Sequence, residues 1–383
     1  MKKWLWIVGL VAVVLGSGVR MSRSGSQLVQ MPLETFPVIE GKFQRAEAGR
    51  LFSFPADHGA HLDYQTEWWY YTGNLVAEDG RLFGFQLTFF RRGLVSQSER
   101  VPRESKWAGD QIYMAHFALS WISDRRFDAF ERFSREAVGL AGTQVDPLYQ
   151  VWLENWKVVQ VGDNQYQLFA EAGDIMLDLA LQDVKGPVLQ GVAGYSQKGP
   201  DPGNASYYYS QTRLLLQGKL TVQNRVLNVH GEGWMDHEFG TSTLSGNQVG
   251  WDWFALQLDE GSELMVYTIR NVNGETDPFS SGMIIRADCS THLLKFEDFI
   301  LKVTDTWKSP QTRAVYPAGW IIEVPGEELT LRVSPRLDNQ ELHLSFTYWE
   351  GSVEVSGEQA GKAVGGQGYA ELTGYAQSMQ GRF

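Results

Sequence analysis

The chain has 383 residues, of which 43% are hydrophobic and 20% are charged, and this globular composition is long enough for two domains of ordinary size. Its formal net charge of −12 disfavours a nucleic-acid partner, because phosphate binding needs clustered Lys and Arg side chains. The single cysteine, Cys289, excludes an intrachain disulfide and a zinc site built on cysteines.

The N-terminus has the pattern of a targeting segment. Lys2 and Lys3 precede a short apolar run at 4–15, and small residues follow at 16–18. This pattern is typical of a secretory signal, and the run is short for a membrane span. We predict that residues 1–22 are a signal peptide or an uncleaved N-terminal anchor, that residues 23–49 are a linker, and that the protein is extracytoplasmic, either periplasmic or secreted. Only the N-terminal segment is expected to contact a membrane.

From about residue 50 the chain is typical of antiparallel strands, with abundant Trp, Tyr, Phe and Gly. The aromatic stretch 67–75, the turn 78–80 and the apolar stretch 82–90 predict a β-hairpin. Residues 130–133 are expected to lead into a helical or irregular connection, and 185–202 to form a loop. Further strands are predicted at 112–121, 149–156, 165–170, 175–181 and 205–216, with a second hairpin at 218–229 around Gln223-Asn224. No stretch has a long 3.6-residue apolar period, so the fold class is all-β.

The second half of the chain repeats the layout of the first. Residues 251–270 resemble the hairpin at 68–91, and the segment 231–240 (GEGWMDHEFG) returns at 366–374 as GQGYAELTG. We therefore predict two tandem β domains, residues 50–242 and residues 243–383. Barrels of eight or more strands need such regular short strands and hold one ligand inside, so two antiparallel barrels are favoured over a pair of sandwiches.

The segment 231–240 holds the densest potential acid–base chemistry in the chain. It contains Asp236, His237 and Glu238, and apolar surroundings can tune such groups to titrate near neutral pH. Aligning the two copies sets Asp236 on Glu371 and His237 on Leu372, so packing alone would accept leucine at position 237. The alternatives are a solvated surface turn, or a structural role for the acid that both copies share.

Other residues are candidates for the same site. On a strand, Glu67, Trp69 and Tyr71 share one face, and Asp252 is the repeat counterpart of Trp69. His116 lies in an apolar strand, where a hydrogen-bonded core histidine is the alternative. The predicted acid–base residues are Asp236, His237, Glu238, Glu67, His116 and Tyr71. The predicted substrate-binding residues are Trp69, Tyr208, Trp234, Trp251, Asp252 and Trp253.

The two central residues pose a geometric problem. Neighbouring residues of a regular strand face opposite sides, so Asp236 and His237 enter one barrel only across a bend or bulge. The glycines at 231, 233 and 240 permit such a bend. Alternatively, the pocket lies between the two domains near residues 251–253, because ligand pockets are common where domains meet.

Metal and cofactor signatures are weak or missing in the sequence. His58 and His61 have the spacing His-x-x-His and could ligate a metal with Asp236 or His237, but in a loop this spacing is weak evidence. The chain has no G-x-S-x-G, P-loop or dinucleotide fingerprint. We therefore expect no metal site and no cofactor.

Five motifs resemble those of a known family. They are 54–59 (FPADHG), 64–75 (YQTEWWYYTGNL), 84–90 (GFQLTFF), 204–210 (NASYYYS) and 234–240 (WMDHEFG). They resemble the AttH and carotenoid 1,2-hydratase (hydroxyneurosporene synthase) group, often labelled predicted secreted hydrolases, over nearly everything after about residue 50. The resemblance implies two lipocalin-like barrels. In that group, the hydratase branch adds water across an isoprenoid double bond, and the secreted AttH-like branch often accompanies ABC-transporter permeases.

Two functions are compatible with these features. We favour an enzyme, a hydrolase or hydro-lyase that acts on a hydrophobic, isoprenoid or lipid-like substrate by carboxylate/histidine acid–base catalysis in an aromatic pocket. A carboxylic acid of raised pKa can protonate carbon, and Trp and Tyr faces stabilise a carbocation. The alternative is a non-catalytic, lipid-binding, lipocalin-like carrier that works with an ABC-transporter permease. A carrier would keep its ligand affinity in H237A and D236N, whereas an enzyme would lose turnover.

Overall fold

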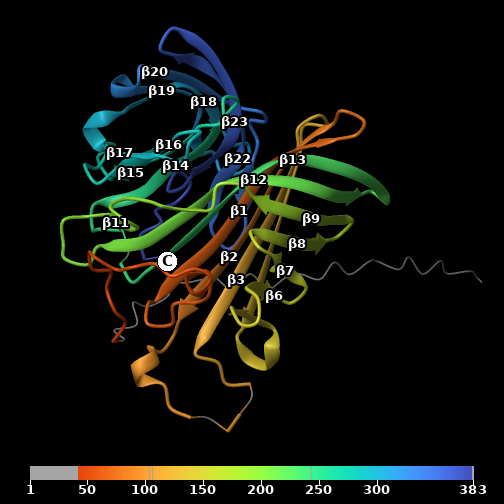
Figure 1. The fold of residues 1–383 in the computed structure, drawn as a ribbon, viewed down its shortest axis with the longest axis vertical. Coiled ribbons are helices and arrows are strands. Elements are labelled where there is room, and N and C mark those ends of the chain that lie inside the picture. The colour runs from red at the N-terminus through yellow and green to blue at the C-terminus, as the bar shows by residue number, and fades with distance from the viewer. Residues whose placement is uncertain (1–41, 103, 106, 243, 382–383) are drawn as a thin grey trace, which may run out of the picture. The chain divides into compact units, whose positions relative to one another are not determined.

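The computed structural model describes residues 42–102, 104–105, 107–242 and 244–381 (Figure 1). The predicted signal or anchor segment 1–22 lies outside the described residues, as does most of the predicted linker. Within the described residues, no helix has the length and hydrophobicity needed to cross a membrane.

Strands and short 3-10 helices make up the regular structure. The first sheet contains β1 (Thr66–Ala77), β2 (Leu82–Gly93), β3 (Gln111–Trp121), β4 (Arg126–Arg135), β5 (Ala141–Gln144), β6 (Gln150–Leu153), β7 (Trp156–Gly162), β8 (Gln165–Ala172), β9 (Ile175–Asp183), β10 (Pro187–Leu189), β11 (Tyr195–Gln197), β12 (Ala205–Val222) and β13 (Arg225–Gly240). The second sheet contains β14 (Gln248–Leu258), β15 (Glu263–Asn271), β16 (Ser281–Ile285), β17 (Thr291–Lys295), β18 (Ile300–Lys308), β19 (Val315–Val324), β20 (Leu329–Pro335), β21 (Glu341–His343), β22 (Thr347–Gln359) and β23 (Lys362–Leu372). The 3-10 helices are η1 (Ala56–His58), η2 (Gln97–Glu99), η3 (Ala137–Gly139), η4 (Phe296–Asp298) and η5 (Pro325–Glu327).

Both sheets are antiparallel, which confirms the predicted all-β fold of two tandem lipocalin-like barrels. The first runs β4-β3-β2-β1-β13-β12-β9-β8-β7-β6-β5 and is nearly closed into a barrel, with β10 and β11 paired to β12. The second runs β17-β16-β15-β14-β23-β22-β20-β19-β18, with β21 paired to β22, and is a half barrel. The first sheet ends at Gly240 and the second begins at Gln248. The exact domain bounds, 50–242 and 243–383, stay a prediction.

The stretch 130–133 lies in β4 and, as predicted, leads into an irregular connection, which contains η3. Two local expectations differ from the structure. The expected loop at 185–202 contains the short strands β10 and β11, which pair with β12. The stretches 205–216 and 218–222 form one strand, β12. The turn between β12 and β13 is at Gln223-Asn224 as predicted, with φ of 51° and 62°, the left-handed values of a type I′ hairpin.

The internal repeat is preserved in strand register. β13 lies between β1 and β12, and β23 lies between β14 and β22. His237 is opposite Trp69, just as Leu372 is opposite Asp252. The two glycine-framed segments therefore occupy equivalent positions in the two sheets.

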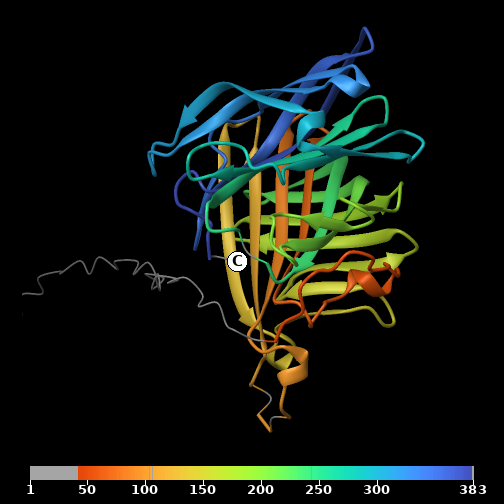
Figure 2. The ribbon, with the colours of Figure 1, turned by 90° about the vertical axis from the view of Figure 1, so that its left-hand side faces the viewer.

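The sheets pack against each other (Figure 2). Hydrophobic side chains of both sheets fill the contact. Two amide side chains join the sheets: Asn74 Nδ2 donates to the Gly368 carbonyl at 3.1 Å, and Gln257 Nε2 donates to the Gly233 carbonyl at 2.8 Å. Each sheet also encloses a hydrophobic core on its other face. The strands β1, β12 and β13 thus contact the core of the first sheet with one face and the second sheet with the other.

Candidate active site between the two sheets

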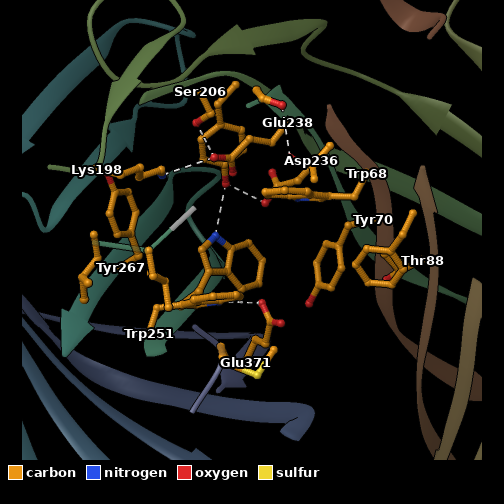
Figure 3. Close-up of a pocket in the computed structure, with 18 of the residues that line it drawn as sticks. Trp68, Tyr70, Thr88, Lys198, Ser206, Asp236, Glu238, Trp251, Tyr267 and Glu371 are labelled. Carbon is orange, nitrogen blue, oxygen red and sulfur yellow. Dashed lines mark hydrogen bonds and ion pairs between the residues drawn. The ribbon is translucent and has the colours of Figure 1, made fainter. Parts of the chain in front are cut away.

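A cavity of about 150 Å³ lies between the two sheets (Figure 3). Its wall combines aromatic rings with four carboxyl groups and one lysine. The lining includes Trp68, Tyr70, Phe90, Lys198, Ser206, Tyr208, Asp236, Glu238, Trp251, Trp253, Tyr267, Tyr348, Glu350 and Glu371.

Strand alternation explains which side chains reach the cavity. In β13, Asp236 and Glu238 face the cavity, while His237 faces the interior of the first sheet. In the second sheet, Glu350 of β22 is directly opposite Glu371 of β23, and both face the cavity. The register of β13 against β1 is continuous from residue 229 to residue 240, so no bulge turns residues 236 and 237 to the same side.

Asp236 accepts three hydrogen bonds at the edge of the cavity. Tyr208 donates at 2.6 Å, Ser210 Oγ at 2.5 Å and Trp234 Nε1 at 2.6 Å. Burial nevertheless raises the pKa of Asp236 to about 7, because the protein interior disfavours the charged form more than these donors stabilise it. A carboxyl with this pKa exchanges its proton near neutral pH.

Glu371 is the repeat counterpart of Asp236 and has a similar environment. Burial raises its pKa to about 7 although Trp251 Nε1 donates to it at 3.1 Å, and the charges of Asp236 and Glu238 raise the pKa further. Glu350 is also buried, and its pKa is raised well above the ordinary value by burial and by the charge of Glu371. At neutral pH this group of acids therefore holds both protonated and ionised members.

Glu238 forms the ionic end of the cavity. Lys198 Nζ lies 3.4 Å from its carboxylate, and Ser206 Oγ donates to the same oxygen. Lys198 Nζ also lies 4.0 Å from the centre of the Tyr267 ring, a cation–π distance. The charge of Glu238 neutralises that of Lys198. The cavity therefore has no net positive charge.

The interior of the first sheet holds a second polar cluster around Glu67. His237 Nε2 donates to Glu67 Oε1 at 2.8 Å, His61 Nδ1 donates to the same oxygen at 2.7 Å, and Arg91 Nε donates to Oε2 at 2.8 Å. The backbone N–H of His61 adds a bond of 2.9 Å to Oε2. The ligating atoms of His61, Glu67 and His237 lie within 4.8 Å of one another, which is close enough for a metal ion. Because Glu67 already accepts from four donors, we interpret the group as a hydrogen-bonded network.

The remaining predicted residues lie in three places. Trp69 and Tyr71 belong to the core of the first sheet, where the Tyr71 hydroxyl is 3.1 Å from that of Tyr149. Asp252 lies on the opposite face of β14 from the cavity and pairs with Arg270. His116 lies behind the cavity wall, and its Nδ1 is 2.8 Å from the Tyr348 hydroxyl.

The structure thus divides the predicted site. Asp236, Glu238, Tyr208, Trp251 and Trp253 line the cavity, and Trp234 donates to one of its acids. Among the lining residues that sequence reasoning did not select are Trp68, Tyr70, Lys198, Glu350 and Glu371. Glu371 had a usable signal, since the repeat alignment already set it on Asp236.

Comparisons with known proteins agree with this architecture. A family model described as AttH-like matches residues 45–375. A crystal structure from Nitrosomonas europaea, described as an AttH, is 33% identical, with a TM-score of 0.77 over 87% of this chain and 99% of that chain. Kievitone hydratase from Nectria haematococca has the same fold at 15% identity, with a TM-score of 0.66 over 88% of this chain and 97% of that chain.

A curated relative adds a shorter match. Dehydratase asqC of Emericella nidulans is 22% identical over 214 residues. The match spans 52% of this chain and only 58% of that protein. The family model and the Nitrosomonas europaea structure cover most of the chain, and the chain therefore belongs to the AttH-like family.

Proposed function

We propose that this protein is a hydro-lyase that adds water to, or removes water from, a neutral hydrophobic substrate in the cavity between the sheets. The observation that carries the proposal is the pair Asp236 and Glu371, two buried carboxyls that face one cavity and have pKa values raised to about 7. Two proteins similar to this chain are named a hydratase and a dehydratase, which supports the reaction class.

The chemistry needs one protonated and one ionised carboxyl. In hydration, the acid gives its proton to an alkene carbon, and the π electrons form the new C–H bond. A water oxygen then bonds to the adjacent cationic carbon, and the ionised carboxyl takes the released proton. Dehydration runs the same steps in reverse. Catalytic groups with pKa values near the working pH perform both proton transfers best.

The rest of the cavity suits a cationic transition state. The rings of Trp68, Tyr70, Trp251 and Trp253 line the wall, and aromatic faces attract positive charge. Since Glu238 is paired with Lys198, the remaining negative charge in the cavity is that of the ionised member of Asp236 and Glu371. We expect neutral isoprenoid or lipid-like molecules to bind better than fatty acids or other anions, because an anion would be buried beside these carboxylates.

A hydrolase would use the same carboxyls differently. One ionised carboxyl would activate a water for attack on an ester or lactone, and the product would be split. The predicted carboxylate–histidine pair is not available for this reaction at the cavity, since His237 faces the other side of β13 and donates to Glu67. Hydration is therefore the better fit to the cavity.

The decisive experiment measures turnover and binding separately. The protein is incubated with neutral isoprenoid alkenes and tertiary alcohols in H₂¹⁸O, and mass spectrometry detects ¹⁸O in the product. D236N and E371Q are each expected to lose about 100-fold or more in kcat, the usual loss for a general acid or base, while quenching of tryptophan fluorescence shows that the ligand still binds. D183N, which changes a buried carboxyl outside the cavity, is the matched control.

The outcomes separate the hypotheses. Incorporation of ¹⁸O without cleavage supports a hydro-lyase, and a cleaved product supports a hydrolase. Ligand binding that survives in D236N and E371Q, with no turnover in the wild type across the panel, refutes the enzyme. That result favours the carrier, which would pass its ligand to an ABC-transporter permease.

We also propose an extracytoplasmic location, which rests on the charged and apolar pattern of the first 22 residues. Cell fractionation tests it directly, and recovery of the native protein from the cytosol would contradict it.

A further inference from the structure

A row of polar side chains leads from the cavity toward the protein surface. Glu350 and Tyr348 of β22 line the cavity, His116 of β3 lies behind them, and Glu131 of β4 follows. The proposed reaction assigns no role to His116 or Glu131. Their side chains are 0% and 17% exposed, so the row passes from the buried cavity to solvent within one strand spacing.

The distances are those of consecutive hydrogen bonds. The Tyr348 hydroxyl lies 2.8 Å from His116 Nδ1, and His116 Nε2 lies 3.0 Å from Glu131 Oε1. Tyr348 and Glu350 are two residues apart on the same face of β22, and their side chains are hydrogen-bonding neighbours. Tyr70 is a second hydroxyl neighbour of the same carboxyl, so Glu350 can turn its proton toward either tyrosine.

The protonation states determine which atom donates and which atom accepts in each hydrogen bond of the row. Burial lowers the pKa of His116 although Glu131 acts to raise it, so the ring is neutral at neutral pH. Partial burial acts to raise the pKa of Glu131, but hydrogen bonds from His116 and from Ser345 lower it below its ordinary value. The ionised Glu131 accepts Nε2–H, so Nδ1 accepts from Tyr348. The Tyr348 oxygen accepts a long bond of 3.4 Å from Gln86 Nε2, and its second lone pair can accept from a protonated Glu350.

Apolar rings surround the middle of the row. The centres of the Phe90 and Phe346 rings lie 5.2 Å and 5.0 Å from the centre of the His116 ring. These rings shield the imidazole from solvent, so a proton moves here along the hydrogen bonds or not at all.

We propose that Glu350, Tyr348, His116 and Glu131 form a proton relay between the carboxyls of the cavity and solvent. Glu350 gives its proton to the Tyr348 oxygen, Tyr348 gives its own proton to His116 Nδ1, and His116 Nε2–H passes to Glu131, which releases a proton to water. Glu350 ends ionised, while Tyr348 stays neutral and His116 changes its tautomer. The reverse sequence brings a proton in.

The relay has a use in turnover, and in this respect it rests on the proposed function. Each hydration leaves the acid without its proton and the base with an extra one. Glu350 is directly opposite Glu371 and can exchange protons with it, so the relay restores the starting protonation state of the cavity. The relay itself requires no substrate, and its existence can be tested without turnover.

The competing explanation is structural. His116 joins β3 of the first sheet to Tyr348 of the second, and a purely structural histidine would stabilise that contact. A structural role predicts a change in stability alone, whereas a relay predicts slower exchange of protons between the cavity and solvent. The experiment must therefore measure proton exchange.

Infrared spectroscopy makes this measurement on the substrate-free protein. After rapid mixing into D₂O, the C=O stretching band of the protonated cavity carboxyls shifts as deuterium replaces hydrogen, and E350Q assigns the contribution of Glu350. Y348F keeps the ring and removes the hydroxyl, and H116Q removes the second link. Each is expected to slow exchange by about tenfold or more, which corresponds to about 1.4 kcal/mol of added barrier.

A matched control excludes a general effect of removing a buried hydroxyl. Y316F removes a hydroxyl that donates to a carboxylate, Glu341, in the second sheet away from the cavity, and exchange should stay at the wild-type rate. Wild-type exchange in Y348F and E131Q would overturn the relay, even if H116Q does not fold. Slow exchange in Y348F combined with no turnover in the wild type would refute the hydro-lyase and leave the relay standing.

Discussion

The buried ion pair between Arg91 and Glu67 yields a stability prediction that needs no knowledge of the substrate. Both side chains are 0% exposed, and Arg91 Nε lies 2.8 Å from Glu67. Arg91 also donates to Gln111 Oε1 at 2.6 Å, to the His61 carbonyl at 2.9 Å and to the Tyr64 carbonyl at 2.8 Å. The variant R91M keeps most of the volume of the side chain and removes all of these donors.

The expected loss follows from what R91M leaves behind. Glu67 would stay ionised in the interior with three donors instead of four, and three further acceptors would lose their hydrogen bonds. Breaking a buried pair in this way costs about 3–5 kcal/mol of the free energy of unfolding. The double variant E67Q/R91M should lose less than R91M alone, because it removes the uncompensated charge together with its partner.

Urea denaturation followed by tryptophan fluorescence measures these changes, with the free energy of unfolding taken from the midpoint and slope. K302M serves as the comparison, because the pair of Lys302 and Glu323 is 55% and 30% exposed, and its loss should cost less than about 1 kcal/mol. The reasoning fails if R91M costs no more than K302M, or if E67Q/R91M is as unstable as R91M.

Three further predictions concern the cavity and the packing around it. Burial raises the pKa of Asp236 from 3.8 to about 7, so the folded state holds this proton more tightly than the unfolded state. The free energy of unfolding therefore falls by about 4 kcal/mol as the pH rises from 3.8 to about 7. D236N should flatten that part of the curve of unfolding free energy against pH, and an unchanged slope would show that the carboxyl is not buried as described. Y208F removes a hydrogen bond that favours ionised Asp236, so the corresponding limb of the pH–rate profile should move to higher pH; a shift to lower pH would contradict this. In G73A the new Cβ would lie 2.6 Å from Leu216 Cδ1, and this overpacking should cost about 1–3 kcal/mol in urea denaturation, whereas G246A, where nothing lies within 4 Å, should be neutral.

Much of the fold could be predicted because its signals are local. The turn at Gln223-Asn224 joins strands that are neighbours in sequence, and a hairpin needs only adjacent strands and a turn with positive φ. The repeat could be recognised in the sequence for a similar reason. Each copy of the glycine-framed segment lies between two neighbouring strands, so both copies are under the same packing constraint. The loop expected at 185–202 was wrong in part, because the short strands β10 and β11 depend on their partner β12 more than on their own residues.

Strand alternation indicated from the sequence that Asp236 and His237 face opposite sides unless a bulge intervenes, and the continuous register of β13 against β1 shows that none does. The sequence alone did not determine which side holds the cavity. That depends on the second sheet, whose β22 and β23 bring Glu350 and Glu371 to the same space as Asp236.

The role of His116 was likewise decided only by tertiary structure. Its partner Tyr348 lies 232 residues away along the chain, and no local pattern relates the two positions. Strand alternation is a property of the backbone of one segment, whereas the contact between the sheets depends on the twist, register and side-chain volume of both sheets together. For this reason Asp236 and Glu238 could be named from the sequence, but Glu350 and Glu371, the shared cavity and its connection to solvent required the folded chain.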